Sequence, residues 1–382
     1  MTSRTVDVVA ASPPSLDPYD PAATAWALAA GFAVGGADVI VYYPAGTPGA
    51  DPPAGVRGEA VPLTLRRPGA AIEAAELASA AGKRLRSEVD LVVRDPSGLG
   101  RLGVRRGRGN GPVVAAFVHD VELAAFDQER TSRPLVGWRD RIDLWRDRRA
   151  VRRLEESALR EADRLFYDAP RLPNALRDAY GIPTDRCRPL PPPVPVVPAP
   201  PTREEARAEF HIPMDVPVVV APAPFEDPER SGTDRAREAF RRVRSFFPGA
   251  RLIVAGTQAP AEPGVVVAPE RNTATLVRAL VAADVAFFDR RVPGFDPGAV
   301  LAMRAGLAVI LGSGVRLPLD PSAGVRELTS DDPGDAASTL AELLADPAAR
   351  RPLAAAAATL AARFEPTAAA EAVITGVRLG AS

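Results

Sequence analysis

The sequence has very few of the residues that build metal centres and covalent cross-links. Cys187 is the single cysteine among 382 residues, so the chain can neither close an intrachain disulfide nor supply a cysteine metal cluster. The two histidines, His119 and His211, are too few for a histidine-based metal centre. We therefore expect no bound metal and no resident cofactor.

Net charge and long apolar runs are also scarce. Lys83 is the only lysine, and the 47 basic residues nearly balance the 48 acidic ones, so nothing indicates a general attraction to nucleic acid. The N-terminal stretch lacks the apolar core of a signal peptide, and no apolar run approaches the length of a membrane span. We expect a cytoplasmic protein, with peripheral membrane contact left open.

Strand-like and helix-like segments alternate along the first half of the chain. Five apolar runs predict buried strands: Val6–Ala11, Asp38–Tyr43, Val61–Leu65, Val89–Arg94 and Val113–Val118. Helices are predicted between and after them at Ala22–Val34, with Asp20 as N-cap, at Ala70–Arg86 and at Arg139–Arg164. This order is typical of a parallel α/β sheet.

The second half repeats the alternation after a proline-rich segment. Residues 189–201 (PLPPPVPVVPAPP) favour extended polyproline geometry and predict a semi-rigid linker, with a ligand for a proline-recognition domain as the alternative. Four further strands are predicted at Val216–Ala221, Arg251–Gly256, Val285–Phe288 and Ala308–Leu311. Helices are predicted at Thr202–Phe210, Arg235–Phe246, Thr273–Ala282, Gly298–Ala305, Asp335–Leu344, Asp346–Leu360 and Thr367–Val377.

Three segments are candidates for binding, each with a plainer alternative. His119 follows a predicted strand, where α/β sheets place ligands, but such a histidine can also simply cap the strand. The basic, glycine-rich loop at 99–110 suits phosphate or anionic lipid, or is only solvated. The helix at Arg139–Arg164 carries tryptophan and arginine and suits a membrane surface, or packs on its own sheet.

A glycine-rich turn between Val285–Phe288 and Ala308–Leu311 is the fourth candidate, because a glycine loop that opens a helix suits an anion. Its sequence, PGFDPGAVLAMRAGLAV, resembles the donor-site segment of retaining GT-B glycosyltransferases of the family 4-like group. The matching residues are Gly294, Phe295, Ala302, Met303, Ala305, Gly306 and Val309. Ala162-Asp163 and Tyr180-Gly181-Ile182-Pro183 are similar to a second family segment.

The resemblance implies a GT-B fold, with two Rossmann-like parallel-sheet domains and a cleft between them. Its domains are 1–188 on the acceptor side and 202–363 on the donor side, followed by a C-terminal helix, within 364–382, that crosses back to the first domain. The family's function implies transfer of a sugar from a nucleotide-sugar co-substrate to an acceptor hydroxyl, with retention.

The implied site residues lie in both domains. His119 is the catalytic candidate, which binds or polarises a hydroxyl. The donor-binding candidates are Arg230, Gly232, Gly256, Gly294, Phe295, Asp296 and Gly298. Asp296 would read sugar hydroxyls, and Arg230 would be the cation for the diphosphate.

The chain departs from the family pattern at its charged positions. Pro293 and Leu301 stand where the family has glutamates, and Glu226 and Ser231 stand where it has a cation pair. These departures favour an alternative, a catalytically inactive GT-B protein that binds or stabilises a protein partner. A phosphorylase or epimerase on the same fold is a third hypothesis, which lacks a convincing pyridoxal-phosphate lysine.

Overall fold

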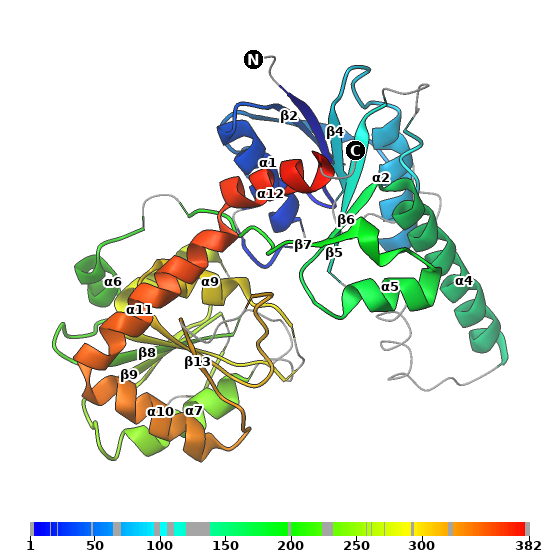
Figure 1. Ribbon diagram of the computed structural model, residues 1–382. Coiled ribbons are helices and arrows are strands. Elements are labelled where there is room, and N and C mark those ends of the chain that lie inside the picture. Colours follow the sequence, from blue (N-terminus) through cyan, green and yellow to red (C-terminus); the bar gives the residue numbers. More distant parts are fainter. Residues whose placement is uncertain are drawn as a thin grey trace. The chain divides into compact units, whose positions relative to one another are not determined.

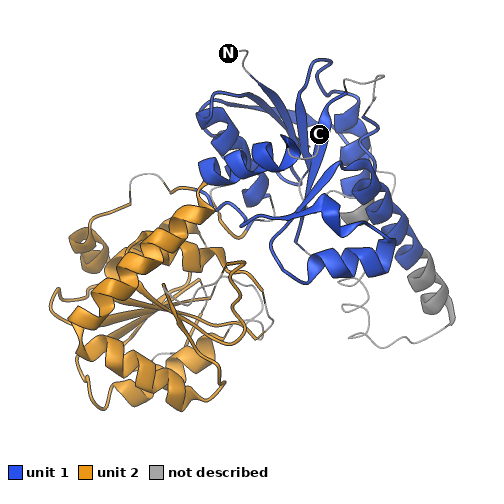
Figure 2. Ribbon diagram, viewed as in Figure 1, with its two compact units in different colours: residues 1–15, 20–195, 366–382 blue, residues 16–19, 196–365 orange. Residues whose placement is uncertain are grey.

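The computed structural model describes residues 4–15, 17–20, 22–46, 49–63, 70–94, 100–104, 111–119, 138–197, 200–223, 232–256, 258–260, 262–270, 272–291, 294–319 and 324–378, with only the backbone at 70–72 and 138–146. The chain divides into two compact units, which Figure 2 colours separately. The first unit contains residues 1–15, 20–195 and 366–382, and the second contains residues 16–19 and 196–365.

The first unit is built on a parallel sheet in the order β3-β2-β1-β4-β5-β6-β7, counted over the described residues (Figure 1). Its strands are β1 (Thr5–Val9), β2 (Asp38–Pro44), β3 (Val56–Val61), β4 (Leu91–Arg94), β5 (Val113–Val118), β6 (Arg164–Tyr167) and β7 (Cys187–Pro189). Its helices are α1 (Ala23–Val34), α2 (Ala70–Gly82), α4 (Trp138–Glu161), α5 (Leu172–Tyr180), the 3-10 turn Thr184–Arg186 and α12 (Pro366–Arg378).

Both faces of this sheet are covered by helices, so its strands are apolar on both sides. One face buries Leu77 of α2, Leu159 of α4 and Leu176 of α5. The other face buries Phe32 of α1 and Val373 of α12. The C-terminal helix α12 thus belongs to the first unit, and it starts so close to α1 that a Cβ at Gly31 would lie 2.0 Å from the Pro366 carbonyl oxygen.

The second unit has the same architecture. Its described strands form a parallel sheet in the order β10-β9-β8-β11-β12-β13. They are β8 (Val218–Pro222), β9 (Arg251–Ala255), β10 (Val265–Ala268), β11 (Val285–Phe288), β12 (Ala308–Leu311) and β13 (Arg326–Glu327). The helices are α6 (Arg203–Glu209), α7 (Thr233–Val243), α8 (Thr273–Ala282), α9 (Pro297–Arg304), α10 (Pro333–Ala345), α11 (Pro347–Ala361) and the 3-10 turn Ala362–Phe364.

Both strand orders reverse beside the first strand of the unit, between β1 and β4 and between β8 and β11. In open α/β sheets, ligands bind outside the carboxyl ends of the strands near such a reversal. The two units therefore each offer one edge where a functional site is expected.

Most predicted elements are confirmed. The strands at Val113–Val118, Val285–Phe288 and Ala308–Leu311 and the helix at Thr273–Ala282 have the predicted bounds. The strand predicted at Val61–Leu65 is wrong, because β3 precedes that segment. Asp20 was also misassigned: the N-cap of α1 is Ala22, and the Asp20 carboxylate accepts the Ala22 N–H at 2.8 Å.

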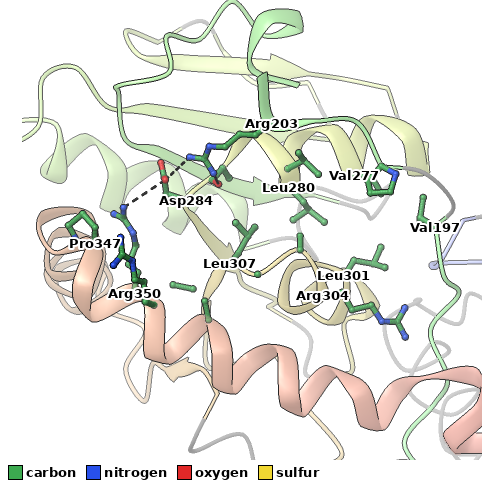
Figure 3. Close-up of a pocket in the computed structure, with 18 of the residues that line it drawn as sticks. Val197, Arg203, Val277, Leu280, Asp284, Leu301, Arg304, Leu307, Pro347 and Arg350 are labelled. Atoms are coloured by element: carbon green, nitrogen blue, oxygen red, sulfur yellow. Dashed lines mark hydrogen bonds and ion pairs between the residues drawn. The ribbon is translucent and has the colours of Figure 1, made fainter. Parts of the chain in front are cut away.

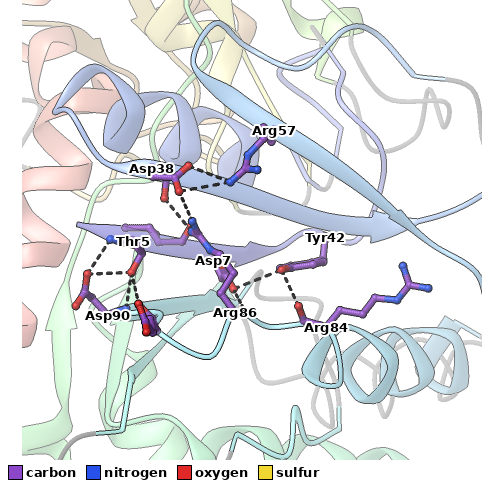
Figure 4. A network of polar contacts seen from close by, with 10 residues as sticks. Thr5, Asp7, Asp38, Tyr42, Arg57, Arg84, Arg86 and Asp90 are labelled. Carbon is purple, nitrogen blue, oxygen red and sulfur yellow. Dashed lines mark hydrogen bonds and ion pairs between the residues drawn. The ribbon is translucent and has the colours of Figure 1, made fainter. Parts of the chain in front are cut away.

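One buried charge of the first sheet serves the fold (Figure 4). Asp7, in the middle of β1, has no exposed surface, and its carboxylate accepts Arg86 Nε at 2.7 Å. Arg86 also contacts Asp38 at the start of β2, so one guanidinium joins two strands. The charges of Asp7, Arg86 and Asp38 are thus paired with one another, so this group gives no reason to expect a ligand.

Candidate functional site

His119 lies where the sequence predicted it, directly after β5 at the carboxyl edge of the first sheet. Its Nδ1 is 2.6 Å from Oδ2 of Asp168, which directly follows β6. The two residues meet because β5 and β6 are neighbours and pair Val118 with Tyr167. Asp168 is 49 residues away from His119 in the sequence, and no sequence motif marks it as a partner of His119.

The geometry of this pair suits proton chemistry. The side chain of His119 is 33% exposed and that of Asp168 is 10% exposed. An ionised carboxylate only accepts hydrogen bonds, so it holds the proton on Nδ1 and directs the Nε2 lone pair of the neutral ring to the opposite side. The first unit therefore presents an oriented imidazole at its carboxyl edge.

Arg94 and Glu161, two buried charged residues of the first unit, pair with each other. Arg94 ends β4 and is buried against Glu161, and burial lowers the pKa of Arg94 to about 10 while the Glu161 carboxylate opposes that change. Glu161 also accepts the N–H groups of Leu102 at 2.7 Å and Gly103 at 2.8 Å. In its described part the loop predicted at 99–110 is thus tied to the protein's own carboxylate, while residues 105–110 lie outside the described residues.

The charged helix α4 packs on its own sheet where its side chains are described. Val151 and Ala158 are buried on the apolar stripe that the sequence predicted. This supports the plainer alternative for the C-terminal half of the helix. The side chains of Trp138 and Trp145, on which the membrane alternative rested, lie outside the described residues.

At the carboxyl edge of the second sheet, an arginine joins two carboxylates. Asp289 follows β11 directly and pairs with Arg235 in the first turn of α7. Arg235 also pairs with Asp331, which in turn accepts the Ser313 hydroxyl. Burial raises the pKa of Asp289, and the Arg235 guanidinium opposes that rise. The sequence gives no sign of this cluster, because four separate segments supply its residues.

Gly232 is packed against this cluster. Its N–H donates to the Asp289 carbonyl oxygen at 3.1 Å, and a Cβ would come within 2.2 Å of the Asp289 carboxylate. Only glycine fits so close to that side chain. The predicted cation Arg230, and the departures Glu226, Ser231 and Pro293, lie outside the described residues.

Asp296 caps the helix that follows the glycine-rich turn. Its carboxylate accepts the Gly298 N–H at 3.0 Å and the Tyr19 hydroxyl at 2.8 Å, and the residue is 2% exposed. Burial raises the pKa of Asp296, opposed first by the Arg290 guanidinium. Burial also raises the pKa of Tyr19 well above its ordinary value, and Asp296 adds to that rise.

The glycines of the turn also make contacts within the chain. The Gly294 N–H donates to the Gly314 carbonyl at 3.0 Å, and a Cβ at Gly298 would lie 2.1 Å from the Tyr19 hydroxyl. The sequence predicts that these amides point at an anion. In the structure, the Gly298 N–H instead donates to the capping carboxylate of Asp296, and the Gly294 N–H donates to the neighbouring segment at Gly314. Donor binding by Gly294 and Gly298 stays a prediction.

Phe295 and Gly256 are the two remaining donor-binding candidates. Phe295 stacks on Phe364, with ring centroids 5.8 Å apart. Gly256 follows β9 with a positive φ of 86° and lines a small cavity of about 40 Å³ with Tyr19 and Asn272. In the second unit the described donor candidates thus lie after β9, at the start of α7 and around the turn after β11, whereas His119 belongs to the first unit.

Comparison with known proteins gives a family-profile match over part of the chain and similar solved structures. Residues 22–198 match the profile of Glycosyltransferase Family 4. Comparison with curated protein sequences gives no significant match.

Solved structures similar to this chain include two that are named as synthases and one that was solved with UDP-glucose. Sucrose-phosphate synthase from Thermosynechococcus elongatus is 16% identical, with 99% of this chain and 100% of that chain covered and a TM-score of 0.65. HepE from Anabaena, solved with UDP-glucose, is 13% identical, with coverage of 98% and 99% and a TM-score of 0.66. The catalytic domain of starch synthase IV from Arabidopsis thaliana, bound to ADP and acarbose, is 11% identical, with coverage of 100% and 99% and a TM-score of 0.69.

These likenesses confirm the predicted fold class. The chain has two parallel-sheet α/β domains that match GT-B glycosyltransferase structures over nearly their full length. In the part of the chain that the structure describes, no helix combines the length and apolar character needed to cross a bilayer.

Proposed function

We propose that this protein is a glycosyltransferase that moves a sugar from a nucleotide-sugar donor to an acceptor hydroxyl, with retention of configuration. The observation that carries the proposal is the His119–Asp168 pair, which presents an oriented, accessible imidazole at a carboxyl strand edge. The Family 4 match over residues 22–198 covers this pair and supports sugar transfer over other reactions of the fold.

In this proposal the two units have different roles. His119 binds or polarises the acceptor hydroxyl, and Asp168 holds the ring in the orientation that this task requires. The second unit binds the donor diphosphate through backbone amides and arginine at its carboxyl edge, so that leaving-group charge is stabilised without a required metal. Arg230 is the predicted cation, whereas Arg235 at the same edge is paired with Asp289 and Asp331.

A nucleotide-binding screen tests the proposal. UDP and ADP are the first ligands to try by calorimetry, since HepE was solved with UDP-glucose and starch synthase IV with ADP, and GDP completes the set. We expect one of them to bind, and Arg230→Ala to abolish that binding. Arg251→Ala is the matched control, because Arg251 starts β9 at the opposite edge of the sheet. The absence of binding by any nucleoside diphosphate at millimolar concentration refutes the donor role.

A second candidate function is binding or stabilisation of a protein partner without catalysis. The self-contained edge of the second unit favours it, because Asp296, Tyr19 and Gly298 satisfy one another where a donor would bind. The family glutamates replaced by Pro293 and Leu301 point the same way.

The Tyr19→Ala variant separates the two candidates. It removes the ring that lies on the first turn of α9 and leaves the Asp296 cap in place. Nucleoside diphosphate binding that is gained or strengthened in this variant supports a donor site that Tyr19 covers. If neither the native protein nor the variant binds, and neither consumes UDP-glucose, the partner function is favoured.

A further inference from the structure

A large pocket lies on the second unit, away from the donor turn (Figure 3). Its volume is about 660 Å³, within the range of about 300–1,000 Å³ that is usual for small-molecule sites. Helices α8, α9 and α11 and the start of α6 form its walls. Asp284 and Ala308, at the amino ends of β11 and β12, line its base, so it opens at the edge opposite to Asp289 and Gly294.

The middle of the pocket is apolar. Leu280 of α8, Leu301 of α9 and Leu307 converge there, and each is at most 6% exposed. Leu301 stands where the resembling family has a glutamate, so the substitution adds to this apolar wall. A surface of this kind favours a hydrocarbon body over a sugar or a nucleotide base.

One end of the pocket carries more positive than negative charge. Asp284 lies 2.7 Å from Arg203, 3.1 Å from Arg207 and 3.8 Å from Arg350, so three guanidinium groups share one carboxylate. Burial, followed by the neighbouring Arg203, lowers the pKa of Arg207, and Asp284 and then Asp215 oppose that change. The positive charge that Asp284 does not balance therefore lies on Arg203 and Arg350, which line the pocket from two different helices (Figure 3).

Other charged residues near the lining helices differ in their contacts, and Arg351 also lines the pocket. Arg304 at the far end contacts Glu365, and Asp346 caps α11 by accepting the Ala348 N–H. The charge pattern is thus polarised, with unbalanced arginine at one end of an apolar cavity.

We propose that this pocket binds a small anionic amphiphile, an alkyl chain ending in a carboxylate or phosphate. The anionic end lies between Arg203 and Arg350, where arginine forks match carboxylate and phosphate geometry. The alkyl chain lies over Leu280, Leu301 and Leu307. The proposal does not depend on sugar transfer, because none of its residues belongs to the donor or acceptor candidates.

Calorimetry on the full-length protein tests this site with dodecanoate and dodecyl phosphate below their micellar concentrations. We expect at least one of them to bind at a single site, and the tighter of the two identifies the headgroup. Dodecyltrimethylammonium, with the same chain and the opposite charge, should bind at least tenfold more weakly. Equal binding of the cation, or no binding of either anion at 1 mM, overturns the proposal.

Two variants locate the binding. Arg350→Gln should weaken the anion at least tenfold, and Ala354→Phe should reduce binding similarly by filling the cavity without changing its charge. Arg203→Gln replaces Arg350→Gln if the latter does not fold. Arg241→Gln on α7 is the control and should bind like the native protein, since α7 packs on the other face of the sheet with α10. Native affinity in both pocket variants places the ligand elsewhere and refutes the assignment.

Discussion

The polar residues at the carboxyl edges of the two sheets differ in how far they are exposed to solvent. In the first unit, the side chain of His119 is 33% exposed and contacts the carboxylate of Asp168. In the second unit, Asp296 is 2% exposed, and the side chains of Asp289 and Arg235 are 6% and 11% exposed. Strand order places both sets where α/β proteins bind ligands, and among these four side chains that of His119 is the most exposed.

The difference separates residues that are arranged for a ligand from residues that hold the edge together. Asp168 orients a ring that still reaches solvent, which suits a group that must act on another molecule. The Asp296 carboxylate, by contrast, accepts hydrogen bonds from the first turn of α9 and from Tyr19 of the same chain. The comparison predicts that substitutions at the first edge change activity and that substitutions at the second edge change stability first.

The largest effect is expected from His119→Ala. If this ring polarises the acceptor hydroxyl, its removal lowers kcat by about 10²- to 10⁴-fold, the usual contribution of general acid–base groups. The measurement is sugar transfer or donor hydrolysis with the nucleotide sugar found in the binding screen. His211→Asn is the control, because Asn tolerates the φ of 55° at that exposed position. Native turnover in His119→Ala removes the residue from the site.

The second effect is the loss of stability in Asp296→Ala. The variant loses a helix cap, at about 0.5–2 kcal/mol, and the hydrogen bond that the buried Tyr19 hydroxyl donates to Asp296, at about 1–3 kcal/mol. We expect the free energy of unfolding to fall by about 1.5–5 kcal/mol in total.

Urea unfolding of this variant should be followed by circular dichroism, because all three tryptophans belong to the first unit and fluorescence would not report on α9. Asp296→Asn is the matched control, since an amide oxygen can accept the same two hydrogen bonds. If Asp296→Ala is as stable as the control but loses donor affinity, Asp296 reads the sugar and the two edges are alike.

Asp168→Asn tests the orienting role at the first edge. Losing one hydrogen bond to a charged group costs about 1.5–3 kcal/mol, which lowers kcat by about 10- to 150-fold. KM should stay near its native value, because Asp168 does not touch the substrate in this proposal. Asp178→Asn, on exposed α5, is the control. A rise in KM with kcat unchanged assigns Asp168 to substrate binding instead.

The strands that sequence predicts well are the buried ones. Val285–Phe288 and Ala308–Leu311 are short, uninterrupted apolar runs, and both have the predicted bounds. β3, whose residues are half exposed and include Gly58, gives no such signal and was placed too late in the chain. β13 consists of two exposed charged residues and was not predicted, because only its pairing with β12 makes it a strand.

The sequence predicts which polar residues follow a strand, but it does not predict which strand ends lie next to each other. The position of His119 follows from the strand before it, but its partner Asp168 is 49 residues away and is brought close by the pairing of β5 with β6. Tyr19 and Asp296 are 277 residues apart. No periodicity links such residues, so the closure of the second edge could not be seen in the glycine-rich turn itself.

The smallest effect is a pH dependence of stability at the second edge. Burial raises the folded-state pKa of Asp296 above its ordinary value of 3.8, so folding favours the protonated carboxyl. The resulting stability is fully present below pH 3.8 and is lost as the pH rises through the folded-state pKa. Native protein should therefore gain stability relative to Asp296→Asn as the pH is lowered through that window. The difference between the two unfolding free energies isolates this residue, because Asp289, whose pKa is also raised by burial, is present in both proteins. If the native protein instead gains stability relative to Asp296→Asn as the pH rises, Asp296 is stabilised as a carboxylate. The second edge then resembles the first edge, which holds His119.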